Sequence, residues 1–85
     1  MVIVHVHLRD DGSYRFELQG GDPGPDITKE LVAIAMAHQS KCFRVPAIDP
    51  NNGAAISYLG GMSVPANNAD AVRDALRNTG RYEIM

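Results

Sequence analysis

The sequence predicts an α+β fold, a two-layer sandwich in which two helices cover one face of a mainly antiparallel sheet. Two observations carry this prediction. Apolar and polar residues alternate on both sides of two turn signals, which indicates two hairpins, and each hairpin precedes a segment with the apolar spacing of a helix. A last short strand completes the order ββαββαβ. We expect one domain, residues 1–85, with about 5 kcal/mol of net stability.

Residues 2–18 form the first predicted hairpin. Every second residue is apolar before and after the turn signal Asp10-Asp11-Gly12: Val2, Val4, Val6 and Leu8, then Tyr14, Phe16 and Leu18. A three-residue loop over 10–12 pairs apolar with apolar residues: Leu8 with Tyr14, Val6 with Phe16 and Val4 with Leu18. It also places Gly12 where such loops need a left-handed residue.

The segment 26–40 has helical periodicity. Asp26 is expected as the N-cap or as an acid of the first turn, where the helix dipole stabilises its negative charge. The predicted buried face contains Ile27, Leu31, Ile34, Ala35 and His38, widened by Val32 and Met36.

The second hairpin is predicted around Asn52-Gly53, a pair typical of two-residue turns. This turn sets Ala47 opposite Tyr58, Val45 opposite Gly60 and Phe43 opposite Met62, all facing the core. Pro46 lacks an N–H and favours an edge position or a bulge. Gly60-Gly61 indicates a bend or bulge in the fourth strand.

A second helix is predicted from a cap at Asn67 or Asn68 to about Thr79, with Gly80 as the residue that ends it. Residues 81–85 then close the chain as a short strand. Its inward side chains are expected to be Tyr82 and Ile84.

Composition excludes several classes. The net charge is −2 and the pI about 5.8, so the chain as a whole does not attract nucleic acid or acidic lipid. One cysteine, Cys42, forms no internal disulfide. No signal peptide is visible and the longest apolar run, 31–37, is far shorter than a membrane span. We therefore expect a cytoplasmic protein that does not enter membranes.

The face of the sheet that the helices leave uncovered, called the open face below, carries the residues predicted to bind a partner. They are His5, His7, Arg9, Arg15, Arg44, Pro46, Ile48, Leu59 and Arg81. Four arginines would surround an apolar strip of Pro46, Ile48 and Leu59. An arginine-rich rim around an apolar patch is typical of protein-binding surfaces.

Nucleic acid is an alternative partner that the arginines suggest. Open sheets bind RNA through aromatic side chains that stack on bases. In the predicted registers all five aromatic residues face the core: Tyr14, Phe16, Phe43, Tyr58 and Tyr82. With no stacking platform on the open face, nucleic acid is the less favoured partner.

The segment Ile3–Asp10, I-V-H-V-H-L-R-D, resembles the H-x-H-x-R signature that opens metal-dependent amidohydrolases such as dihydroorotases. The resemblance implies that His5 and His7 are metal ligands and that Arg9 contacts substrate, in a small metal-dependent hydrolase. That family uses a barrel of ~250 residues with ligands on later strands. In this chain the only other histidine is His38, on the first predicted helix.

The interpretation we favour is a non-enzymatic protein-binding module. It is an inhibitor or adaptor of the kind that phages and mobile elements encode, with no catalytic residue, cofactor or metal. Self-association into a homodimer through the apolar strip or a free sheet edge is also expected.

Overall fold

The computed structural model describes residues 1–85 and confirms the α+β class and the order ββαββαβ. The strands are β1 (Val2–Leu8), β2 (Tyr14–Leu18), β3 (Lys41–Ile48), β4 (Ala55–Val64) and β5 (Tyr82–Ile84). The helices are α1 (Pro25–Ala37) and α2 (Ala69–Thr79), the second preceded by a short 3-10 turn, η1 (Ala66–Asn68). Neither α-helix has the length and hydropathy that a membrane-spanning segment needs.

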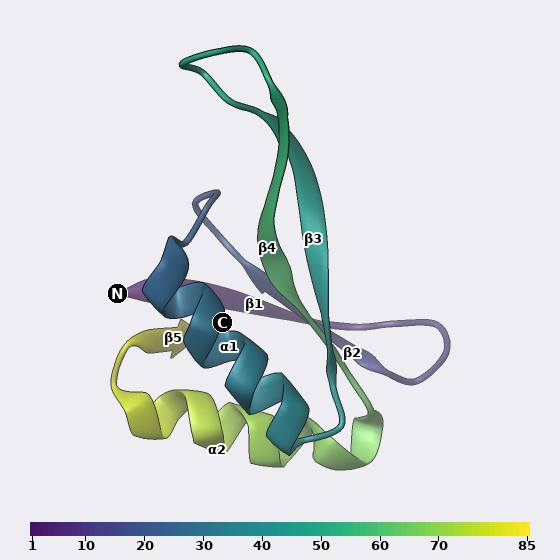
Figure 1. The fold of residues 1–85 in the computed structure, drawn as a ribbon. Coiled ribbons are helices and arrows are strands. Elements are labelled where there is room, and N and C mark those ends of the chain that lie inside the picture. Colours follow the sequence, from purple (N-terminus) through teal and green to yellow (C-terminus); the bar gives the residue numbers. More distant parts are fainter.

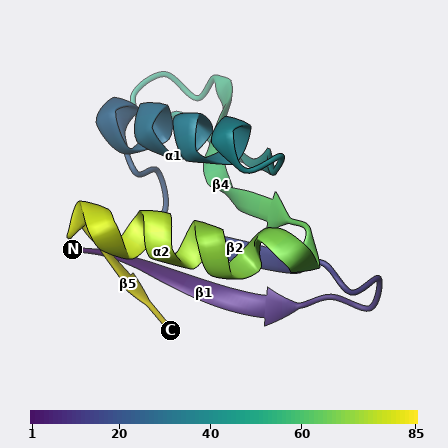
Figure 2. The same ribbon diagram turned by 90° about the horizontal axis from the view of Figure 1, so that it is seen from below.

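The strands form one sheet in the order β3-β4-β2-β1-β5 (Figure 1). Neighbouring strands are antiparallel, except that β5 runs parallel to β1. Both helices pack on the same side of the sheet, and α1 lies beside α2 at the β3–β4 end (Figure 2). The core between the layers is formed by Val4, Phe16, Leu31, Ala35, Leu59, Met62, Val64, Val72, Leu76 and Tyr82.

The first hairpin has the predicted register, with Leu8 opposite Tyr14 and Val6 opposite Phe16. Gly12 has a φ of 87°, which confirms the left-handed position in the loop. The Asp11 carboxylate accepts hydrogen bonds from the N–H and the hydroxyl of Ser13, and these bonds lower the pKa of Asp11. The turn is therefore stabilised by its own side chains.

Helix α1 is shorter than predicted. It begins at Pro25, after Gly24, and Asp26 is the acid of its first turn rather than the N-cap. It ends at Ala37 because the chain turns at Gln39, whose φ is 52°. The expectation that Val32 and Met36 widen the buried face is wrong, since these side chains are 38% and 77% exposed.

Helix α2 and β5 agree with the prediction. Asn68 precedes α2, and Gly80 ends it with a left-handed φ of 75°. The Asn68 side chain does not cap its own helix but donates a hydrogen bond of 2.6 Å to the carbonyl of His38, which ties the start of α2 to the end of α1. Tyr82 is buried in the core, as expected.

The second hairpin departs from the predicted register. Ile48 lies opposite Ala55, so the loop contains the four residues 50–53 instead of a two-residue turn. Two side chains hold this loop: Asp49 accepts a hydrogen bond from the N–H of Asn51, and Asn52 accepts one from the N–H of Ala54, each of 2.9 Å. Such Asx turns compete with the tight turn that Asn-Gly favours.

The bulge predicted at Gly60-Gly61 is present, because the β3–β4 register shifts between Phe43 and Arg44. On the body side of the bulge, Cys42 lies opposite Met62, where Phe43 was expected. A slip of one residue moves every side chain of a strand to the other face. Phe43 and its alternate neighbours therefore lie on the open face, and the prediction for β3 is wrong.

Candidate functional site

The open face carries a row of hydrogen-bond donors across four strands. His7 of β1, Arg15 of β2, Ser63 of β4 and Lys41 of β3 are successive cross-strand partners. At about 4.8 Å per strand the row is roughly 14 Å long. It contains no carboxylate of its own, but Glu17 of the adjacent row accepts a hydrogen bond from Arg15. His7 and Arg15 were predicted on this face; Lys41 and Ser63 were not among the predicted site residues.

The next row on the open face contains an aromatic stack. Phe43 lies opposite Gly61, and the guanidinium carbon of Arg15 lies 4.1 Å from the centre of the Phe43 ring. Arg15 also donates a hydrogen bond of 2.9 Å to Glu17. One face of the Phe43 ring is thus covered by the planar guanidinium of Arg15.

The glycine pair explains how Phe43 fits there. A Cβ atom on Gly60 would lie 2.6 Å from the Phe43 ring, and one on Gly61 would lie 1.9 Å from the carbonyl oxygen of Phe16. Only glycines leave space for the ring and for the close approach of β4 to β2. Two glycines opposite an aromatic residue were the sequence signal that could have placed Phe43 on this face.

Several predicted open-face residues lie elsewhere. Leu59 is only 2% exposed and belongs to the core, so its assignment to a binding strip is wrong. Arg44, its cross-strand partner, lies on the helix side and donates two hydrogen bonds of 2.8 Å to Ser57. Cys42 packs against the core, and burial raises the pKa of its thiol, which disfavours a reactive thiolate.

Arg81 was predicted on the open face but reaches the helix layer. Its Nε donates a hydrogen bond of 3.1 Å to Glu30 of α1, its terminal nitrogen forms an ion pair with the same carboxylate, and the hydroxyl of Tyr82 donates a third bond of 2.7 Å. The bonds from Arg81 and then Tyr82 lower the pKa of Glu30. This cluster joins α1 to β5, and this structural role accounts for the lowered pKa of the Glu30 carboxyl.

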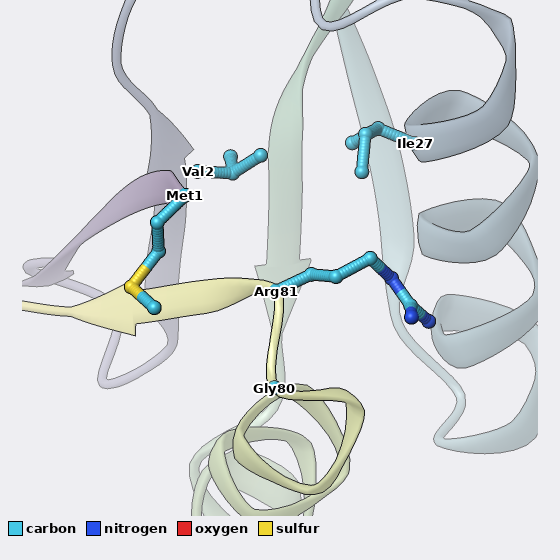
Figure 3. Close-up of a pocket in the computed structure, with 5 residues that line it drawn as sticks. All are labelled: Met1, Val2, Ile27, Gly80 and Arg81. Carbon is cyan, nitrogen blue, oxygen red and sulfur yellow. The ribbon is translucent and has the colours of Figure 1, made fainter.

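Figure 3 shows an open cleft beside this cluster, between the start of β1, the start of α1 and the end of α2. It is lined by Met1, Val2, Ile27, Gly80 and Arg81. The Arg81 side chain points toward α1, where Glu30 engages it. The other hollow lies at the first turn, where Arg9 sits beside Asp10 and Asp11. In both places the cation already has acidic neighbours.

The two histidines on β1 face the same way. The ring centres of His5 and His7 lie 6.3 Å apart with the rings nearly parallel, and Nε2 of His5 lies 2.7 Å from the Gln19 amide oxygen. No third His, Cys, Asp or Glu side chain joins them in a metal-binding cluster. The surrounding fold is an open sheet with helices on one side, not the barrel that the resemblance to amidohydrolases implies.

The outer half of the second hairpin, residues 45–58, extends beyond both helices and is called the arm (Figure 1). On its helix side Leu59 is the last buried residue, and beyond it Pro46 and Ile48 are exposed, Ile48 by 66%. On its other side Ile56 is 40% exposed. Pro46 and Ile48 of the predicted apolar strip are therefore exposed, as expected. They lie on the helix side of the sheet, however, and not on the open face.

The free edge of β3 is protected. The N–H of Asp49 donates a hydrogen bond to the carbonyl of Ala54 and so points toward the β4 side. Because successive backbone N–H groups of a strand point in opposite directions, the nitrogen of Pro46 points away from β4, toward the free edge. Pro46 lacks a donor there, and Lys41 and Arg44 add charge to the same strand. Proline and cations are devices that prevent edge-to-edge pairing. The expected self-association through this edge is therefore disfavoured.

No known family model matches the chain, and neither a curated protein nor a solved structure shows significant similarity to it.

Proposed function

We propose that this protein binds another protein through the arm, without catalysing a reaction, and so acts as an inhibitor or adaptor. The exposure of Ile48 is the observation that carries the proposal. A large aliphatic side chain, 66% exposed at the far end of a projecting ribbon, contributes nothing to its own core. Its burial by a partner would supply a hydrophobic anchor.

The neighbours of Ile48 support this role. Pro46 lies two residues away on the same side of β3, and Ile56 is exposed on the opposite side of the ribbon. Arg44 is held at the base of the arm by Ser57. A partner groove that encloses the ribbon would contact both sides, with polar atoms at the rim of the contact.

We expect Ile48→Asp to weaken partner binding by about 30-fold or more, because a charge would replace the anchor. Leu8→Asp is the matched control, since Leu8 is 68% exposed at the other end of the molecule. Proteins captured from nuclease-treated extract by the wild type and both variants are compared by mass spectrometry, and the affinity for the purified partner is then titrated. A partner retained equally by Ile48→Asp would refute the proposal.

A second candidate function is contact with single-stranded nucleic acid across the open face. The sequence prediction placed no aromatic residue on that face, whereas in the observed register Phe43 and Tyr58 lie there, with the Arg15 guanidinium stacked on the Phe43 ring. The donor row of His7, Arg15, Ser63 and Lys41 lies beside the Arg15–Phe43 stack. Cations and planar groups together are what such binding uses.

We expect Lys41→Ala to weaken oligonucleotide binding and to reduce the slope of log affinity against log salt by about 1. Arg77→Ala is the control, since Arg77 is an exposed cation on α2, on the other side of the sheet. Fluorescence anisotropy with a labelled single-stranded oligonucleotide over a salt series measures both effects. Equal losses in the two variants, or affinity that does not depend on salt, would exclude this function.

A further inference from the structure

Helix α1 is apolar on its outer side as well as on its buried side. Residues 31–37 are seven apolar residues in succession. Leu31 and Ala35 face the core, whereas Val32, Ala33, Met36 and Ala37 are exposed, Met36 by 77%. In Figure 2 α1 lies at the margin of the helix layer, on the far side of α2 from β1. A helix that is apolar all round is normally buried, so this stripe lacks its cover.

The outer stripe is complementary in shape to itself. It alternates two large side chains, Val32 and Met36, with two small ones, Ala33 and Ala37. If a second α1 lies antiparallel on the first, with position 33 facing position 36, then position 32 faces position 37. Each large side chain then meets a small one, which is how helix surfaces interdigitate.

The charges on α1 fit the same arrangement. Lys29 is exposed on the same stripe, one turn before Val32 and Ala33, and in the antiparallel pair it lies just beyond Ala37, the last residue of the second α1. The last turn of α1 contains no basic residue. A cation near the C-terminal end of a helix is stabilised by the helix dipole.

We propose that two copies of this chain associate through antiparallel α1 helices related by a two-fold axis. Met36 packs on Ala33 of the second copy, and Val32 packs on Ala37. A two-fold contact uses the same surface of both copies, and the stripe has that property. The contact residues Val32, Ala33, Met36 and Ala37 do not belong to the arm or to the open face, so the proposal stands independently of the proposed function.

The test introduces opposite charges at positions 36 and 33, which face each other across the two-fold axis, and measures the dissociation constant by sedimentation velocity. The wild type should be a dimer that dissociates on dilution. Met36→Glu and Ala33→Lys should each raise the dissociation constant by about 100-fold, because each places two like charges in the contact. An equimolar mixture should restore the dimer, since Lys at position 33 then meets Glu at position 36 while the other pair stays native.

Ala71→Lys, on the exposed side of α2, is the control and should leave the dimer unchanged, and circular dichroism checks that every variant is folded. A wild type that is monomeric at all concentrations would overturn the proposal. So would a dimer that survives Met36→Glu, a dimer lost in Ile48→Asp, or a mixture that fails to restore association. Partner capture that is unchanged in Ile48→Asp, with the dimer intact, would count against the arm alone.

Discussion

Replacement of Gly61 by alanine should remove most of the stability of the protein, with an expected loss of about 3–5 kcal/mol. The added Cβ would lie 1.9 Å from the carbonyl oxygen of Phe16, a backbone atom that cannot move without separating β2 from β4. The φ of Gly61 is 152°, in a region that is essentially restricted to glycine. The loss is close to the total stability of about 5 kcal/mol expected for this chain length.

Chemical denaturation followed by circular dichroism measures this loss. Gly53→Ala is the control, because Gly53 also has a positive φ, 70°, but no atom lies within 4 Å of its added Cβ. The control should lose only about 1–2 kcal/mol. If both variants lost the same small amount, β2 and β4 would not approach as closely as the bulge requires.

The first hairpin could be predicted from the sequence because two signals agreed. The alternation through Leu8 and Tyr14 allowed one register, and the loop residues 10–12 suited the same one. The second hairpin lacked this agreement. Its turn contains Asp49, Asn51 and Asn52, any of which can form local turns, and only the folded hairpin selects the four-residue loop.

The error in the second hairpin has a physical cause that the sequence pattern hides. Beyond the bulge the two faces of β4 exchange, so Leu59 and Met62 lie on the same side although three positions separate them. The interval between β-strand residues on one face is two only where no bulge intervenes. The pair Gly60-Gly61 predicts a bulge, but it does not indicate how many residues of β4 are left without a partner on β3.

The candidate site was therefore predicted in part. On β1 and β2 the outward residues His5, His7 and Arg15 follow from simple alternation. Arg81 was misplaced because its long side chain leaves the strand direction to reach Glu30, a partner 51 positions away. Such an ion pair depends on how α1 packs beside β5, which no local pattern specifies.

Leu59→Asp is the second change with a large expected effect. The strip predicted from the sequence would make this variant a folded protein that no longer binds its partner. In the structure Leu59 is 2% exposed, so the substitution places a carboxylate in the core, at an expected cost of about 4 kcal/mol or more. Arg44 lies opposite, but its guanidinium already donates to two oxygen atoms of Ser57.

Denaturation curves of Leu59→Asp and Ile48→Asp separate the two interpretations, because the residues carry the same substitution on the same side of the hairpin. Ile48 is 66% exposed, so its variant should stay within about 0.5 kcal/mol of the wild type. Leu59→Asp should lose its cooperative transition. A stable Leu59→Asp would mean that Leu59 lies at the surface and that the contact strip begins closer to the body. Loss of the transition would instead confirm that Leu59 is a core residue and remove it from any contact surface.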